Sequence, residues 1–137
     1  MNLFADSSAL AKCYIADETS DDFDALLLRA TSLSASVLCV PEIILALCRR
    51  RQERTLTQAQ YAAAKGALES DLANATVIQI IDEVLLASVR LLETNPLRSS
   101  DALQIASALA WHSDTFVSAC ARQCVTAKTS GLSVITL

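Results

Sequence analysis

Short apolar segments with strand-like composition alternate along this chain with longer segments of helical periodicity, and this alternation constrains the fold more than any other feature. Strands are predicted at Asn2–Ala5, Ser34–Val40, Thr76–Ile81, Thr115–Ala119 and Ser133–Leu137. Each of the first four precedes one or more segments in which apolar residues recur at helical spacing. This alternation favours a parallel sheet with helices on both faces, so an α/β fold is predicted.

The predicted helices fill most of the remaining chain. Helices with predicted bounds are Ser7–Ile15, Glu42–Arg54 with Pro41 at its first position, Asp101–His112 and Cys120–Thr129. Three more are predicted from their ends: one is capped by Thr19 or Ser20, one is capped by Thr57 and extends through Leu72, and one begins at Asp82 and stops at Asn95–Pro96. Two Gly and two Pro in 137 residues indicate short connections. No linker or repeat divides the chain, so a single domain over residues 1–137 is predicted.

Composition bounds the function classes. Apolar residues make up 53% and charged residues 19%, which predicts a folded core. The net charge of −4 argues against a protein that holds nucleic acid by bulk positive charge, but not against a nuclease with locally sorted charges. The five Cys form no CxxC pair, and neither a signal peptide nor a membrane-spanning apolar run is visible in the sequence. These features predict a cytoplasmic protein without a membrane partner.

Two common catalytic classes are also excluded. The chain has no glycine-rich loop to cradle a phosphate, which excludes nucleotide-binding Rossmann and P-loop proteins. The lone His112 ends a predicted helix, so no Ser-His-Asp arrangement is indicated.

Three acids are the candidate catalytic residues. Asp6 and Glu42 follow predicted strands, and Asp101 begins a helix behind Arg98–Ser99–Ser100. We expect all three to point to one end of the sheet, where their repulsion calls for a hard divalent cation such as Mg²⁺. Such an ion acidifies water and stabilises charge on a phosphate, which indicates phosphodiester hydrolysis. Alternatively, each acid is a helix N-terminal charge stabilised by the dipole.

Four segments make this interpretation specific, namely LFADSSALAKCYIADE, VPEIILALCRRR, LRSSDALQIASALAWHSDTFVSA and AKTSGLSVITL. Together they resemble a PIN domain, with VapC-type toxins of toxin–antitoxin pairs as the best match. The resemblance implies a three-layer α/β/α sandwich around a mostly parallel sheet. It also implies a Mg²⁺- or Mn²⁺-dependent ribonuclease acting on RNA, usually a homodimer, inhibited by a cognate VapB-type antitoxin.

Carried over by position, the family's first three metal-binding acids fall on Asp6, Glu42 and Asp101. The hydroxyl that follows the first acid falls on Ser7 or Ser8, and Ser118 matches the usual Thr or Ser at the end of the fourth strand. These hydroxyls are candidates to orient Asp6 or to bind the substrate's phosphate.

Cys120 stands where the family has a fourth acid, and this loss should weaken binding of a hard ion. Several interpretations follow. Three acids suffice for metal-dependent cleavage, or Asp114 compensates, or Cys120 and Cys124 favour a softer ion. Otherwise the nuclease is impaired, and at the limit the chain is a catalytically silent PIN-fold binding or regulatory module.

Basic residues are the candidate contacts with the RNA backbone. Lys12 and Arg98 lie near the acids in sequence, and Arg49 and Arg50 belong to a cluster beyond Glu42. The alternative for this cluster is a set of solvated cations that stabilise a helix C-terminus.

Overall fold

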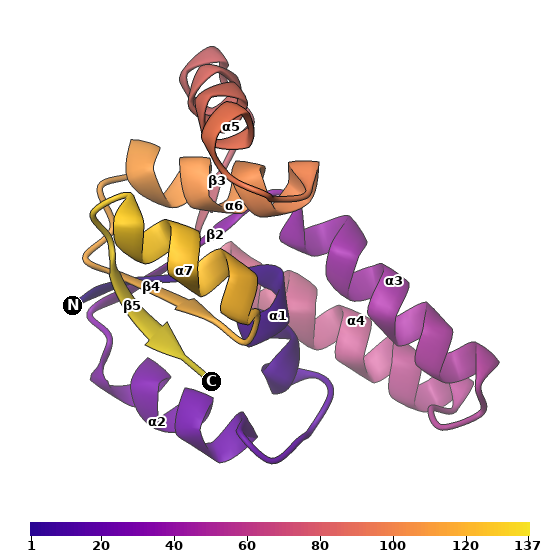
Figure 1. Cartoon of the computed structure of the whole chain (residues 1–137). Helices are drawn as coiled ribbons and strands as arrows, with labels where there is room; N and C mark the ends of the chain where they lie inside the picture. Colours follow the sequence, from indigo (N-terminus) through magenta and orange to yellow (C-terminus); the bar gives the residue numbers. More distant parts are fainter.

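Five parallel strands form one sheet in the spatial order β3-β2-β1-β4-β5 (Figure 1). The computed structural model describes residues 1–137. The strands are β1 (Asn2–Ala5), β2 (Ser32–Ser36), β3 (Thr76–Ile78), β4 (Thr115–Ser118) and β5 (Ser133–Thr136). Because all strands run the same way, their carboxyl ends share one edge of the sheet.

Helices cover both faces of this sheet, which confirms the three-layer α/β/α sandwich (Figure 1). One face packs against α1 (Ser7–Leu10), the 3-10 turn η1 (Ala11–Cys13), α2 (Ser20–Arg29), α3 (Cys39–Gln52) and α4 (Gln58–Ala73). The other packs against α5 (Asp82–Thr94), α6 (Ser99–Ala110) and α7 (Ala121–Thr129).

The central strands β1 and β4 are buried on both faces. Leu3 and Ala5 of β1 point into the first core, whereas Phe4 points into the second and stacks on Phe116 of β4 with ring centroids 5.5 Å apart. Burial of each such side chain stabilises the fold by about 1.5–3 kcal/mol. The two strands therefore form a rigid base for whatever follows them.

All strands are parallel, but the side of the sheet on which the chain adds its next strand changes between β3 and β4. The chain passes from β1 outward to β2 and β3, then returns through α5 and α6 to β4 on the other side of β1. In open parallel sheets, ligands bind in the crevice beyond the strand ends at such a reversal. Asp6 follows β1 and Ser118 ends β4, so both lie at this crevice.

The predicted strand Ser34–Val40 is shifted in the structure. β2 ends at Ser36, whose hydroxyl accepts a hydrogen bond from the amide of Leu38 at 3.2 Å and turns the chain. The apolar residues after this turn already belong to α3, so Pro41 is the third helical residue rather than the first. The first helical turn tolerates proline because its amides have no intrahelical acceptor.

Two other predicted boundaries are wrong for local reasons. β3 ends at Ile78 because its partner β2 ends at Ser36, the last residue that pairs with it. The predicted helix Ser7–Ile15 instead divides into α1 and η1, because the amides of Tyr14 and Ile15 both bond to the carbonyl of Ala11.

No helix in the structure is both long and apolar enough to cross a membrane.

Candidate active site

Asp6 lies at the centre of the crevice and is fully buried. It caps α1: its Oδ1 accepts hydrogen bonds from the amide of Ala9 at 2.9 Å and the hydroxyl of Ser8 at 2.7 Å. Its Oδ2 accepts from the hydroxyl of Ser118 at 2.6 Å. The carboxylate is thus fixed by donors from α1 and from the end of β4.

The environment of Asp6 disfavours its ionised form. Burial raises the pKa of Asp6 above its ordinary value, hydrogen bonds from Ser118, Ser8 and Ala9 oppose this shift, and the nearby charge of Glu42 adds to it. A buried carboxylate next to a second acid costs stability, and such groups cluster at functional sites.

Glu42 joins the site through a shared hydrogen-bond network. Its Oε1 accepts from the hydroxyl of Ser7 at 3.0 Å and from Nε2 of Gln104 at 2.9 Å. The same Gln104 nitrogen donates to the Ser7 hydroxyl at 2.8 Å. Residues from α1, α3 and α6, distant in sequence, therefore meet beside Asp6.

Asp101 lies in the first turn of α6, three residues before Gln104, and has its own partners. Its Oδ1 accepts from Nε2 of Gln123 at 2.9 Å, and its Oδ2 accepts from the amide of Arg98 at 3.3 Å. Nε of Arg122 lies 3.5 Å from the same Oδ2. The Asp101 side chain is 9% exposed and that of Arg122 43%, so a solvent-accessible guanidinium partly neutralises a buried acid.

Cys120 occupies the N-cap position of α7 at the border of this site, and its thiol makes no capping hydrogen bond. Its amide donates to the Ser118 hydroxyl at 2.9 Å, and its neighbour two residues on is Arg122. Cys124 is buried and points its thiol to the carbonyl of Ser118 at 3.7 Å. Asp114 lies at the opposite edge of the sheet, where it accepts from the amide of Asn2 at 2.8 Å, so it does not compensate for Cys120.

The candidate basic residues separate in space. Lys12 is buried, and its ammonium is paired with Asp17 rather than with Asp6, Glu42 or Asp101. Arg98 is exposed at the start of α6, directly before Asp101. Arg49 and Arg50 are both exposed on α3, but Arg50 lines a small cavity with Tyr14 and its neighbours.

The oxygen atoms at the site fit a divalent ion that has few protein ligands. No three His, Cys, Asp or Glu side chains form a group able to enclose a metal, so neither a closed carboxylate cage nor a soft-ion site is formed. Two buried amide oxygens, Oε1 of Gln104 and Oε1 of Gln123, have no hydrogen-bond donor although each amide contacts one of the acids. Unpartnered oxygens next to carboxylates fit a hard ion that is held by one or two carboxylates and keeps several waters.

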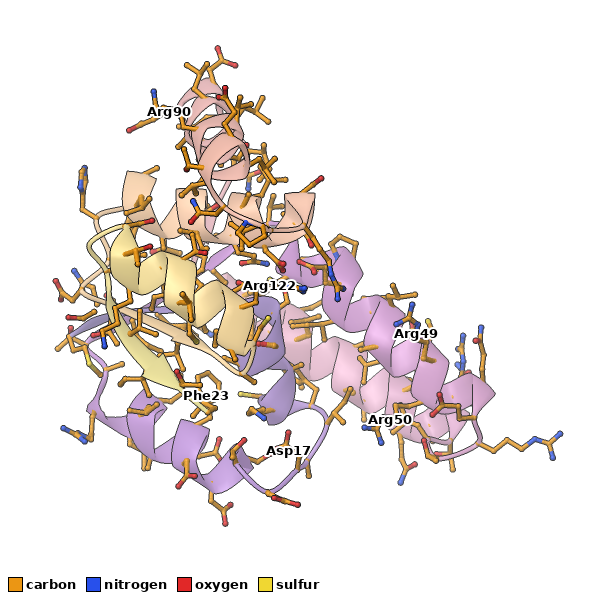
Figure 2. All side chains as sticks on the ribbon, viewed as in Figure 1. Asp17, Phe23, Arg49, Arg50, Arg90 and Arg122 are labelled. Atoms are coloured by element: carbon orange, nitrogen blue, oxygen red, sulfur yellow. The ribbon has the colours of Figure 1, made fainter.

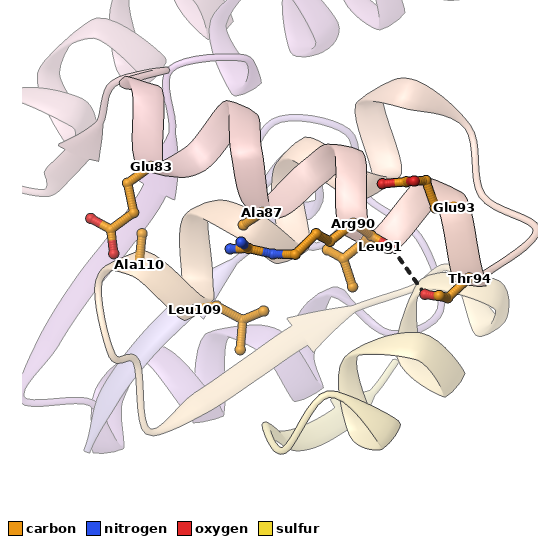
Figure 3. Close-up of a pocket in the computed structure, with 8 residues that line it drawn as sticks. All are labelled: Glu83, Ala87, Arg90, Leu91, Glu93, Thr94, Leu109 and Ala110. Atoms are coloured by element: carbon orange, nitrogen blue, oxygen red, sulfur yellow. Dashed lines mark hydrogen bonds between the residues drawn. The ribbon is translucent and has the colours of Figure 1, made fainter.

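The acids do not border any of the cavities of the molecule. The largest cavity, of about 540 Å³, lies between α5 and α6 (Figure 3) and is lined by Glu83, Ala87, Arg90, Leu91, Glu93, Thr94, Leu109 and Ala110. None of the cavities of the molecule includes Asp6, Glu42 or Asp101 in its lining.

Comparison with solved structures identifies the fold. The chain superimposes on the VapC20 toxin of Mycobacterium tuberculosis, which cleaves the sarcin–ricin loop, with a TM-score of 0.74 and 14% identity over 98% of this chain and 99% of that one. This chain has the VapC fold. A toxin–antitoxin complex from Klebsiella pneumoniae shares the fold at a TM-score of 0.69 and 17% identity over 99% and 97% of the two chains. FitAcB from Neisseria gonorrhoeae does so at 0.73 and 12% over 98% and 96%.

No protein-family model and no curated protein sequence matches the chain, so the VapC fold is established by structure alone. Within it, sequence reasoning missed three polar residues, Gln104, Gln123 and Arg122. Gln104 had a visible signal: it lies three residues after Asp101 on the same face of an otherwise apolar helix segment. Gln123 and Arg122 had none, because their role depends on the docking of α7 against α6.

Proposed function

We propose that residues 1–137 form a single VapC-type PIN domain, an endoribonuclease that is the toxin of a toxin–antitoxin pair. The observation that carries the proposal is the fully buried Asp6 carboxylate beside Glu42, at the point of the sheet edge where the strand order reverses. A fold retains such a costly group where function requires it. The reaction class is supported by the shared fold of VapC20, described as a sarcin–ricin loop cleaving toxin.

A Mg²⁺ or Mn²⁺ ion at Asp6, Glu42 and Asp101 belongs to this proposal, with one or two of the three acids as direct ligands and the rest acting through bound water. When bound, such an ion makes water more acidic and stabilises negative charge on a phosphate. The chain itself supplies the positioning: Ser118 fixes one oxygen of Asp6, and Gln104 fixes one oxygen of Glu42. These contacts hold the acids in place before substrate arrives, which is the main requirement for electrostatic catalysis.

In this proposal, a few local positive charges bind the RNA to an otherwise acidic protein. Arg98 and Arg122 flank Asp101, and both are exposed. Their guanidinium groups can bind backbone phosphates on either side of the bond that is cleaved. Binding through a few cations agrees with the net charge of −4, which excludes a broad basic surface.

A cognate VapB-type antitoxin and a second copy of the chain are the proposed protein partners, and the cytoplasm is the proposed location. The antitoxin is supported by the Klebsiella pneumoniae neighbour, which is a toxin–antitoxin complex. The homodimer is supported by an exposed apolar stripe on and before α5, formed by Ile81, Leu85, Val89 and Leu92.

The test is cleavage of a structured RNA by the purified chain with Mg²⁺, with Mn²⁺ and with a chelator, and with product ends mapped. We expect cleavage at defined positions that requires the ion and falls at least 100-fold in Asp6→Asn. The matched control is Asp22→Asn, the same change at an exposed position of α2, which should cleave like the wild type. Equal cleavage by Asp6→Asn, or cleavage that persists in chelator, contradicts the proposal.

A second candidate function is a catalytically silent PIN-fold binding or regulatory module. It is favoured by Cys120 at the fourth acidic position and by the Arg122 guanidinium already paired with Asp101. Wild-type chain that cleaves no RNA and binds no Mn²⁺ in a calorimetric titration, while it still binds an antitoxin, would establish this alternative over the nuclease.

A further inference from the structure

The α3 helix extends outward from the acids and carries an arginine on their side. Glu42 lies in the first turn of α3, and Arg49 follows seven residues later. At about 100° and 1.5 Å per residue, seven residues return to within about 20° of the same direction and advance about 10 Å. Arg49 therefore lies on the same face of the helix as Glu42, two turns farther from the crevice.

The other arginines of the α3 cluster are turned elsewhere or are already engaged. Arg51 points to the opposite side, where its guanidinium lies 4.3 Å from the ring centroid of Tyr61 and donates to Gln58 at 2.9 Å. Arg50 lines the cavity next to Tyr14. Figure 2 shows Arg49 and Arg50 on different sides of α3.

Arg49, by contrast, is exposed, and its side chain makes no hydrogen bond or ion pair. Between Glu42 and Arg49, this face of α3 carries no charge. Leu45 is 51% exposed there and Ala46 is half-buried. One turn beyond Arg49, Glu53 brings a negative charge onto the same face. Positive charge on this face is thus confined to one position, at a fixed distance from the acids, and it ends there.

A second arginine near the acids is Arg122 of α7, which is paired with Asp101 at 3.5 Å but keeps 43% of its side chain exposed. Figure 2 shows Arg122 at the end of α7 that faces α3, and Arg49 farther out along α3. Arg122 thus lies beside Asp101, and Arg49 lies on the face of α3 that carries Glu42. A chain of phosphates that crosses the crevice meets these two cations, whereas the acids themselves repel it unless an ion intervenes.

We propose that the RNA segment on one side of the scissile phosphate lies along the outer face of α3, with a backbone phosphate bound by Arg49 and an apolar contact at Leu45. The proposal rests on the ribonuclease function proposed above and assigns its substrate a direction across the fold. Because Arg49 contacts the backbone and the chain offers no aromatic stacking surface there, this contact adds affinity without selecting a base.

The test combines binding and cleavage with Arg49→Ala and Arg50→Ala, which remove the same charge from neighbouring positions. Fluorescence anisotropy with a single-stranded RNA oligonucleotide is measured over a range of salt concentrations. Arg49→Ala should weaken binding about fivefold and reduce the slope of log K against log salt by about 0.7, the value for one phosphate contact on a single strand. Arg50→Ala should lose less than a third as much, and Arg49→Lys should restore most of the slope.

Direction is tested by shortening the RNA from each end of its mapped cleavage site. The effect of Arg49→Ala on kcat/KM should disappear when nucleotides are removed from one end, and it should persist when they are removed from the other. Equal losses for Arg49→Ala and Arg50→Ala, or an effect independent of both flanks, overturn the inference even if the RNA is cleaved. Absence of cleavage together with an Arg49-specific loss of binding would instead refute the nuclease and leave the binding path in place.

Discussion

Ser118 provides the sharpest test of the hydrogen-bond network at the crevice, because its hydroxyl bonds to both Asp6 and the amide of Cys120, and it also lies 3.3 Å from the Ser8 hydroxyl. It donates to Oδ2 of Asp6 at 2.6 Å and accepts from the amide of Cys120 at 2.9 Å. Ser118 is fully buried, and it is the one donor to that oxygen of Asp6. Ser118→Ala therefore removes a bond to a charged group and leaves the amide of Cys120 without its acceptor.

The expected loss of stability follows from these two contacts. A hydrogen bond to a charged group contributes about 1.5–3 kcal/mol, and an unsatisfied partly buried amide adds about 1 kcal/mol. We expect Ser118→Ala to lower the free energy of unfolding by about 2–4 kcal/mol. With a urea dependence of about 2 kcal/mol per molar, the midpoint of unfolding falls by about 1–2 M.

Ser113→Ala is the matched control, since it removes the same hydroxyl from another buried position. The Ser113 side chain is buried, but its oxygen has no hydrogen-bond partner. Its removal should change the free energy of unfolding by less than about 0.5 kcal/mol, in either direction. Both variants are compared with the wild type by circular dichroism in urea, under the same ionic conditions.

The pH dependence supplies a second check on the same reasoning. The hydrogen bond from Ser118 favours the ionised form of Asp6. Burial has the opposite effect and raises the pKa of Asp6 above its ordinary value. The difference between the wild type and Ser118→Ala should therefore be full above the pKa of Asp6 and shrink as pH falls through it. Equal midpoints for Ser118→Ala and Ser113→Ala, or a difference that grows in acid, would refute the network as described.

Two further predictions concern charges at and near the site. Cys120→Asp should lower the Mg²⁺ concentration at half-maximal cleavage by about tenfold, or about 1.4 kcal/mol, whereas the neutral Cys120→Asn should give no gain; the measurement is initial cleavage rate against Mg²⁺, and equal curves would show that this position does not matter. The hydrogen bond from Lys12, followed by that from the amide of Thr19, lowers the pKa of Asp17 to about 2. Lys12→Met should move the carbon-13 titration of the Asp17 carboxyl upward towards 3.8, and an unchanged titration would show that Lys12 is not its partner. Any stability from this pair is present above the ordinary pKa of Asp17 and is lost as pH falls towards 2.

The acidity of the chain takes on a specific meaning in this fold. Asp6 and Asp101 are buried acids that protein donors hold in place, while the acids of α2 lie exposed on another part of the surface. Two amide side chains, Gln104 and Gln123, each place a nitrogen on an acid and leave an oxygen unpartnered. The low overall charge therefore coexists with a locally organised acidic crevice, and with arginines placed individually beside it.

The sequence by itself determined the alternation of strands and helices, and hence the α/β class, because strand and helix periodicities depend on local residue spacing. It also indicated Asp6, since this acid directly follows a predicted strand and so is expected at the carboxyl edge of the sheet. The residues at which these elements end were predicted less accurately than their type. The end of β3 depends on the length of its partner β2, which no local pattern of residues 76–81 contains.

The tertiary structure alone decided which polar residues meet at the crevice. The order β3-β2-β1-β4-β5 places Ser118 beside Asp6 although 112 residues separate them, and the packing of α6 joins Gln104 to Glu42 across 62 residues. It also separated Arg49 from Arg50 and paired Arg122 with Asp101. These contacts depend on the directions in which packed helices present their side chains, and sequence spacing carries that information only within a single helix.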